Sequence, residues 1–239
     1  MSTREEFFGR IRKALGRRPD ESAPDRHPGQ LFPPLEGVMS PIPSDQIIDK
    51  FEAELQKVDG FTYRASTLAG LDEIVRKILQ DHQAKSAVCT RNPILKALGL
   101  PEKIASWGVK STVWPGAEDA SKSFKTNVFS AEIGISGVEF VLAESGSLVI
   151  TSRTEGSQLA SLAPPTHVAL YRRDQAKATL EEVLERLPVP TDPNQPLPGR
   201  SVVFVTGPSR TADIEQILIR GVHGPKHVHA ILVEDSCLV

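Results

Sequence analysis

The stretch from Ser201 to Val233 constrains the fold of this chain more than any other part of the sequence. It begins with an apolar, mostly β-branched run, breaks at a Gly-Pro pair, continues with apolar residues at Ile214, Ile217 and Leu218, and ends in a second apolar run. Runs without polar alternation are typical of strands buried on both faces, and the i, i+3, i+4 spacing is typical of a helix. We therefore predict a strand–helix–strand crossover, which implies a parallel sheet.

The turn after the first of these strands is a candidate ligand site, because open α/β proteins bind ligands where parallel strands end and helices begin. Its ligand-binding candidates are Gly207, Ser209, Arg210 and Thr211. In the alternative interpretation, Thr211 only caps the helix and Arg210 pairs with a carboxylate such as Asp213. The spacing matches neither a P-loop nor a dinucleotide-binding fingerprint.

The chain between residues 44 and 187 also alternates helix-like and strand-like segments. We predict helices over Ser44–Val58, Leu68–Asp81 and Ala176–Leu187, and strands over Phe61–Ala65, Ser86–Thr90, Val109–Trp114 and Thr166–Tyr171. Three closely spaced strand-like runs between residues 131 and 152 favour hairpins. The expected fold is therefore α/β, with three layers (α/β/α) around a mixed, mostly parallel sheet.

Glu144 is the candidate catalytic acid. It ends an apolar run and is followed by Ser145 and Gly146, so its carboxylate is expected at a strand tip beside a tight turn with free backbone N–H groups. A carboxylate there could act as nucleophile or general base, with Ser145 and Gly146 contributing to ligand binding. In the alternative interpretation, Glu144 faces water or pairs with Arg153 across the hairpin.

Three histidines and one arginine are further candidates. His227 and His229 are expected to share one face of the last strand, but their spacing matches no metal motif, so we predict no metal site. His223, in the glycine-rich turn before that strand, is a candidate proton carrier or ligand contact near Ser209. Arg91 follows a predicted strand end and either faces the ligand or is a solvated, structural residue.

Charge and cysteine content exclude several classes of protein. A net charge of −2 and a pI near 6.3 give no electrostatic basis for binding nucleic acid or an anionic membrane. The two cysteines, Cys89 and Cys237, form no CxxC pair and are too few to hold a cysteine-ligated iron–sulfur cluster alone. Without a signal-peptide core or an apolar run of about 18 residues, the chain is expected to be cytoplasmic, with no membrane insertion.

Residues 1–43 are expected to form a separate N-terminal part, and residues 44–239 the main domain. Thr3 can cap a short helix with Phe7, Phe8 and Ile11 on one side, and an arm rich in Pro, Gly and charged residues follows. The helix either docks on a partner or packs against its own domain.

Three segments of the sequence resemble a known family. GPSRTADIEQILIRGVHGP with the strand after it, AEIGISGVEFVLAESGSLVITS, and PPTHVAL are similar to segments of the lactate-utilisation (LUD-domain) family. The resemblance covers about residues 44–239. Glu144, Ser145 and Gly146 match the acidic residue, hydroxyl residue and glycine of the family's central segment.

The resemblance implies a fold similar to that of CoA transferases, ribose-5-phosphate isomerase and glucosamine-6-phosphate deaminase, whose strand-tip clefts bind anionic metabolites. It implies a role in oxidising L-lactate to pyruvate beside partner subunits that hold iron–sulfur clusters, with no cofactor bound by this chain itself. The alternative is a CoA-transferase-like or isomerase-like enzyme that acts on a small carboxylate or acyl-CoA through Glu144. That alternative rests on fold analogy, because some CoA transferases use a glutamate nucleophile.

Overall fold

The computed structural model describes residues 4–14, 40–114, 120–187, 201–214 and 217–238. Contacts divide the chain into two units, Met1–Pro41 and Ile42–Val239. In the first unit, helix α1 (Arg4–Ala14) forms where the sequence predicts it, with the side chains of Phe7, Phe8 and Ile11 exposed. Most of the predicted arm lies outside the described residues.

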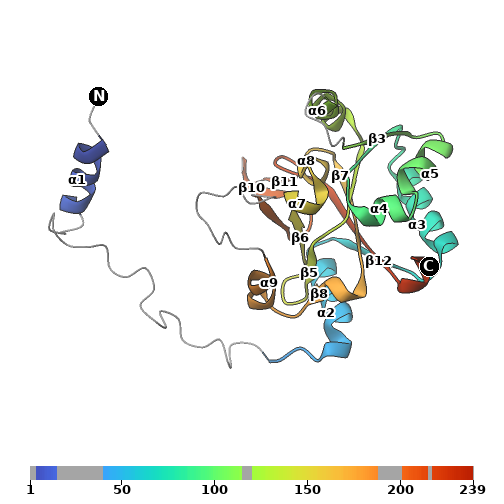
Figure 1. The fold of residues 1–239 in the computed structure, drawn as a ribbon, viewed down its shortest axis with the longest axis horizontal. Helices are drawn as coiled ribbons and strands as arrows, with labels where there is room; N and C mark the ends of the chain where they lie inside the picture. Colours follow the sequence, from blue (N-terminus) through green and yellow to red (C-terminus); the bar gives the residue numbers. More distant parts are fainter. Residues whose placement is uncertain (1–3, 15–39, 115–119, 188–200, 215–216, 239) are drawn as a thin grey trace. The chain divides into compact units, whose positions relative to one another are not determined.

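The second unit is built on a six-stranded sheet in which all neighbouring strands are parallel (Figure 1). Across the sheet the strands are β1 (Phe61–Ala65), β12 (His227–Val233), β7 (Thr166–Tyr171), β4 (Ile133–Ser136), β2 (Ser86–Cys89) and β3 (Lys110–Val113). The four inner strands are almost wholly buried, because helices or other strands cover both faces. This is why their sequences are nearly continuous apolar runs.

Helices cover both faces of this sheet, so the predicted α/β class is confirmed. On one face, the side chains of Leu71, Leu95 and Leu100 pack with alternate strand residues such as Val168 and Leu170. They come from α3 (Leu68–Asp81), α4 (Pro93–Ala97) and α5 (Leu100–Ser106). The opposite face is covered by α2 (Ile47–Lys57), preceded by the 3-10 turn η1 (Ser44–Gln46), and by α6 (Ala120–Ser130) and α8 (Leu159–Leu162).

A second sheet of four strands packs on the face that α2 covers. Its order is β8 (Ala176–Lys177), β5 (Phe140–Leu142), β6 (Ser147–Thr151) and β9 (Val202–Val205). Strands β5 and β6 form the hairpin expected near residue 145, whereas β4, which precedes them, belongs to the parallel sheet. The antiparallel pairs that we predicted within one mixed sheet therefore lie in this second sheet.

The crossover predicted for Ser201–Val233 is wrong. Strand β9 pairs antiparallel with β6, and the predicted helix is instead a hairpin of β10 (Arg210–Ile214) and β11 (Ile217–Arg220). Thr211 therefore caps no helix and lies opposite Ile219. The segment is rich in β-branched residues, which favour extended backbone, so its apolar spacing fits two short strands as well as one helix.

Strand β9 is also not buried on both faces as predicted. It lies at the edge of the second sheet, and Val202 and Phe204 are 39% and 41% exposed. The remaining short elements are α7 (Ser152–Glu155), η2 (Arg173–Gln175), α9 (Leu180–Arg186) and η3 (Asp235–Cys237). Within the described ranges, no helix has the length and apolar character needed to cross a lipid bilayer.

Candidate functional site

The carboxyl ends of β2 and β4 form a topological switch point of the parallel sheet. From β2 the chain crosses to β3 on one side and then returns to β4 on the other side of β2. The loop that leaves β2 leads to α4 on one face of the sheet, and the loop that leaves β4 leads to β5 in the second sheet on the opposite face. In open α/β sheets, ligands bind outside the strand ends at such a point.

A fully buried carboxylate joins the loops at this point. Glu155, at the end of α7, has no exposed surface. Its Oε2 atom accepts hydrogen bonds from Thr90 Oγ1 at 2.5 Å and from the Gly137 N–H at 3.0 Å. Its Oε1 atom accepts from Thr154 Oγ1 at 3.0 Å and from the Asn92 amide. One side chain thus connects the segments that follow β2, β4 and β6.

The hydrogen-bond donors around Glu155 indicate what its carboxylate does. Burial raises the pKa of its carboxyl group, and the hydrogen bonds from Thr90, Asn92, Thr154 and Gly137 oppose that rise. Each carboxylate oxygen of Glu155 accepts two hydrogen bonds from neutral donors. If either oxygen were protonated, its O–H group would point at one of these donors and one of the hydrogen bonds would be lost. The arrangement suits a carboxylate that holds the loops in place rather than one that exchanges protons with solvent.

Two arginines neighbour Glu155: Arg153 precedes it in α7, and the backbone N–H of Arg91 donates to its carbonyl at 3.2 Å. Arg153 forms an ion pair with Glu139, whose Oε2 also accepts a hydrogen bond from Thr151 Oγ1 at 2.9 Å. Arg91 is exposed, and its Nη2 donates to the backbone carbonyl of Arg153 at 3.3 Å. Among the described carboxylates, none forms an ion pair with Arg91. This edge of the sheet therefore carries an exposed guanidinium that is not part of an ion pair with a described carboxylate.

The predicted catalytic acid Glu144 lies in the β5–β6 turn, as expected from the sequence. Its Oε1 accepts a hydrogen bond from the Leu180 N–H at 2.9 Å, at the first turn of α9. The alternative pairing with Arg153 does not occur, because Arg153 pairs with Glu139. The turn is at the opposite end of β6 from Glu155. A catalytic role for Glu144 stays a prediction, although its carboxylate already caps a helix.

The segment that directly follows β9, Thr206 and Gly207, lies close to this turn. Ser147 Oγ is 2.7 Å from Ser145 Oγ and 2.6 Å from Thr206 Oγ1. Gly146 lies against Leu55, and Gly207 lies against Val58, so both turns contact the C-terminal part of the α2 segment. The structure thus brings the two segments together; ligand binding by Ser145, Gly146 and Gly207 stays a prediction.

Ser209, Arg210 and His223 are placed by local contacts. The His223 N–H donates to Ser209 Oγ at 3.3 Å, so these two residues are neighbours as predicted, through the backbone of His223. Arg210 and Arg220 each donate to Asp59 Oδ2 at 2.6 Å. The alternative interpretation, that Arg210 pairs with a carboxylate, therefore describes its observed contact.

The turn at Gly146 gives a direct stability prediction. Gly146 has φ +66°, and a Cβ atom there would lie 2.3 Å from the backbone nitrogen of Leu55. Gly99 has φ +59° but nothing within 4 Å of its Cβ position, so it is a matched control. We expect Gly99→Ala to lower the free energy of unfolding by about 1 kcal/mol, and Gly146→Ala by about 2–3 kcal/mol because backbone must also move. Equal losses in urea unfolding would contradict the close approach.

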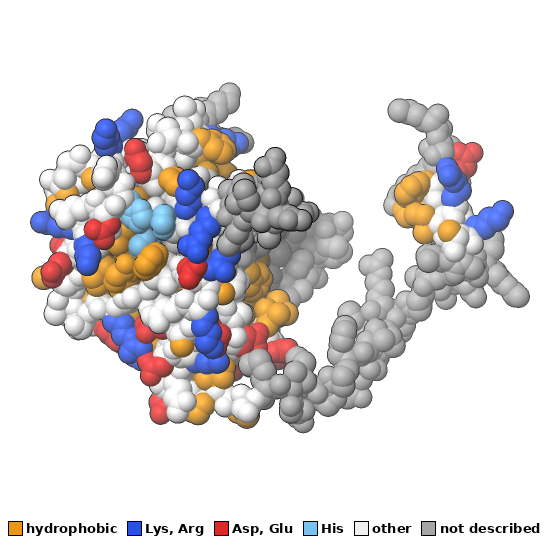
Figure 2. All heavy atoms as spheres, turned by 180° about the vertical axis from the view of Figure 1, so that it is seen from behind, with side chains coloured by type: hydrophobic (Ala, Val, Ile, Leu, Met, Phe, Trp, Pro, Cys, Tyr) orange, Lys and Arg blue, Asp and Glu red, His pale blue; other side chains and the backbone are white. Residues whose placement is uncertain are grey.

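His82, His227 and His229 form a cluster in which His82 and His227 are partly exposed and His229 is buried; Figure 2 shows histidine side chains at the surface beside hydrophobic side chains. His82 Nε2 is 3.1 Å from His229 Nε2, and the ring centroids of His82 and His227 are 4.7 Å apart. The ring of Phe61 stacks on His229, and Tyr63 Oη is 3.2 Å from His229 Nδ1. In the part of the chain that the structure describes, no group of three or more His, Cys, Asp or Glu residues is arranged to hold a metal ion.

A further histidine is buried at the centre of the sheet. His167 Nε2 is 2.8 Å from Ser136 Oγ, and its Nδ1 has no hydrogen-bond partner. Burial lowers the pKa of His167 to about 3, and burial also lowers the pKa of His229 to about 3. Both imidazoles are therefore neutral at neutral pH.

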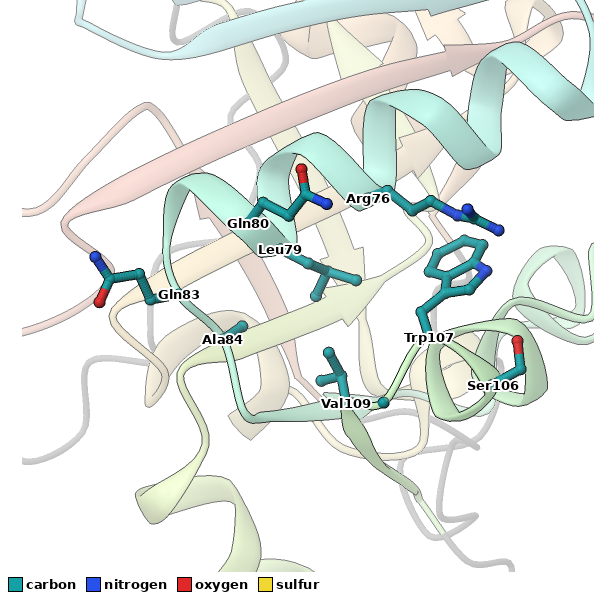
Figure 3. Close-up of a pocket in the computed structure, with 9 residues that line it drawn as sticks. Arg76, Leu79, Gln80, Gln83, Ala84, Ser106, Trp107 and Val109 are labelled. Carbon is teal, nitrogen blue, oxygen red and sulfur yellow. The ribbon is translucent and has the colours of Figure 1, made fainter.

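A hollow of about 670 Å³ lies between α3 and α5 at the amino end of β3 (Figure 3). The Arg76 guanidinium lies 4.5 Å from the centroid of the Trp107 ring at its wall. No acid, histidine or cysteine is among the residues that line it. Because it lies at the amino ends of the strands and lacks an acid–base group, we favour the β2–β4 edge as the functional site.

Comparison with known proteins identifies the family. A family model for the LUD domain matches residues 48–233. The chain belongs to the LUD domain family. The curated proteins similar to this LUD-domain chain include "Lactate utilization protein C" of Halalkalibacterium halodurans, 27% identical over 235 residues that cover 98% of this chain and 99% of the relative. Lactate utilization protein C of Oceanobacillus iheyensis is 27% identical over 238 residues, with the same coverage.

A solved structure resembles this LUD-domain chain in fold. It is the crystal structure of a DUF162 family protein from Deinococcus radiodurans, with a TM-score of 0.53 and 19% sequence identity. The likeness covers 81% of this chain and 99% of that chain. At this identity it supports the α/β fold alone.

Sequence reasoning missed Glu155 and its donors in this LUD-domain chain. Glu155 is the last residue of α7, and α8 follows it after a short connection. A signal was present, because Glu155 also follows a β-branched strand and precedes Gly156 and Ser157, much as Glu144 precedes Ser145 and Gly146. Glu155 is the buried one of the two acids because it contacts the segments that follow β2 and β4, which are distant from it in sequence.

Proposed function

We propose that the protein is a component of an L-lactate utilisation system, in which L-lactate is oxidised to pyruvate, and that it acts with partner subunits that hold iron–sulfur clusters. The observation that carries this proposal is the end-to-end similarity to proteins named Lactate utilization protein C, which spans nearly all of both chains. Membership of the LUD domain family supports it further.

The cysteines support assigning electron transfer to partners. The chain has two, Cys89 and Cys237, and both are buried. Burial raises the pKa of Cys89 to about 12 and also raises the pKa of Cys237, which disfavours the thiolate that metal ligation requires. A cysteine-ligated cluster needs more thiolates than this chain supplies. In this proposal the chain contributes a site for a small anionic ligand, a partner interface, or both.

The alternative function is a CoA-transferase-like or isomerase-like enzyme that uses Glu144 on a small carboxylate or acyl-CoA. It would require the Glu144 carboxylate to leave its hydrogen bond with the Leu180 N–H, at least transiently. Among the described side chains, none that is ionisable forms an ion pair or hydrogen bond with Glu144, so no such contact supports the alternative. The growth experiment described next tests this alternative function through the Glu144→Gln variant.

The proposal predicts a conditional growth defect. A strain that lacks this chain is expected to lose growth on L-lactate and to keep growth on pyruvate, because only lactate oxidation fails. The full-length chain, expressed with an affinity tag, should restore growth and co-purify iron-containing subunits from lactate-grown cells. Normal growth of the deletion strain on L-lactate would contradict the proposal. Glu144→Gln should complement fully; failure of a stably folded Glu144→Gln chain would favour the alternative.

A further inference from the structure

We propose that Arg91, Trp114 and Gly156 form a binding site for the carboxylate of a small 2-hydroxy or 2-oxo acid, at the carboxyl ends of β2 and β3. The position of the site follows from the geometry of these residues. The choice of a short hydroxy or oxo acid rests on the proposed function.

Arg91 is held in place through its main chain and its side chain. Its backbone N–H donates to the Glu155 carbonyl at 3.2 Å, and its guanidinium donates through Nη2 to the Arg153 carbonyl at 3.3 Å. The nearby Arg153 is already paired with Glu139. Arg91 is therefore an exposed cation held at the switch point, and it forms no ion pair with any described carboxylate.

Gly156 lets the arginine and an indole approach the same point of the backbone. Its φ is +76°, and a Cβ atom there would lie 2.3 Å from Trp114 Cδ1 and 2.9 Å from Arg91 Nε. A side chain at residue 156 would therefore push both groups away. The glycine is required by the backbone conformation and by this close approach.

Trp114 provides a rigid apolar wall next to the guanidinium. It directly follows β3, and its N–H continues the sheet by donating to the Cys89 carbonyl at 2.8 Å. Its ring packs edge to face on the buried Phe124, with centroids 4.9 Å apart, and is itself only partly buried. The indole can therefore cover the apolar part of a ligand without itself moving.

The guanidinium of Arg91 and the indole of Trp114 together indicate which class of ligand the site would bind. A guanidinium binds a planar carboxylate through two parallel N–H···O bonds, and an indole face or edge beside it favours an apolar group on the same molecule. A short acid with a methyl group offers both features. Inorganic phosphate offers the charge without the apolar group, so it tests whether the site recognises more than an anion.

The two tryptophans of the chain make the test specific. Trp107 lines the hollow at the amino end of β3, and Trp114 lies at the other end of that strand. In the full-length Trp107→Phe protein, tryptophan fluorescence, excited selectively over the two tyrosines, therefore reports on Trp114 alone. We expect L-lactate and pyruvate to change this fluorescence in a saturable way, whereas uncharged L-lactamide and inorganic phosphate do not.

Arg91→Gln should weaken binding at least about 10-fold, because it removes a charged hydrogen-bond donor pair, and Arg91→Lys should weaken it less. Arg186→Gln, on the exposed part of α9, is the matched control and should leave binding unchanged. Calorimetric titration of the parent chain and its Arg91→Gln variant repeats the comparison without the Trp107 substitution.

Equal affinity in the parent and Arg91→Gln chains would overturn the inference, as would no saturable binding of either acid. Binding of phosphate as tight as that of the acids would overturn the ligand class. The inference and the proposed function fail separately. If neither acid binds but the deletion strain cannot grow on L-lactate, the site is wrong and the function stands. If the acids bind through Arg91 but the deletion strain grows normally, the site stands and the function is wrong.

Discussion

Glu155→Ala is expected to lower the free energy of unfolding by about 3–5 kcal/mol, the range found when one partner of a buried polar network is removed. Four donors lose their acceptor at once: Thr90, Asn92, Thr154 and the Gly137 N–H. The segments after β2, β4 and β6 then lose the group that joins them. Urea unfolding of the purified protein measures the loss directly.

Two controls make this result interpretable. Glu185, exposed on α9, can be changed to alanine with an expected loss of no more than about 0.5 kcal/mol. Glu155→Gln keeps the size of the side chain but turns one acceptor into a donor that faces donors, so it should cost about 2–3 kcal/mol. If Glu155→Ala is as stable as Glu185→Ala, Glu155 does not hold the loops together.

Acidification from pH 6.5 to pH 5 is expected to remove about 3 kcal/mol of stability through His167 and His229 together, about 1.6 kcal/mol from each. Both side chains have a folded pKa of about 3 because of burial. In the unfolded chain an imidazole titrates near pH 6.5, so below that pH the unfolded state binds protons that the folded state cannot accept. The stabilisation is complete above pH 6.5 and is lost as the pH falls toward 3.

The surroundings of these histidines support the direction of the effect. His229 contacts His82 and Tyr63, and its pKa is lowered further by His82 and His227. Asp81 acts in the opposite direction on His82, but burial lowers the pKa of His82 more strongly. Protonating the cluster would therefore place cations side by side.

Carboxylates also titrate on acidification, so substitutions are needed to measure the contribution of these two histidines to the pH dependence of stability. The mean slope of unfolding free energy against pH between 6.5 and 5 should fall by about 1.1 kcal/mol per pH unit in His167→Gln and again in His229→Gln. His223→Gln is the control, because that side chain is exposed and should leave the slope unchanged. An unchanged slope in the His167 and His229 variants would show that the two imidazoles are not kept neutral by folding.

Local patterns were sufficient for most elements of the fold. Strand residues such as Val168 and Leu170 are apolar on both sides because β7 is central, and the predicted bounds Thr166–Tyr171 match β7. Helix α3 begins and ends as predicted because Thr67 caps it and its apolar residues keep a helical period. These features depend on neighbours within one segment, which the sequence contains directly.

Apart from the β10–β11 hairpin, whose apolar spacing also fits a helix, the errors concern pairings between distant segments. The run at Val202–Val205 looks like a buried central strand, yet it pairs with β6 at the edge of a second sheet. Glu144 and Glu155 occupy similar sequence contexts, and their different environments arise from contacts with α9 and with the ends of β2 and β4. No local pattern distinguishes a helix-capping acid from a buried one when the partners lie elsewhere in the chain.

A crystal structure of the full-length protein with bound L-lactate or pyruvate would show most directly where this chain holds its ligand. We predict electron density for a carboxylate on the Arg91 guanidinium, with the rest of the acid against Trp114. Density at the turn of Glu144–Gly146, or in the hollow between α3 and α5, would contradict a ligand site at the β2–β4 edge.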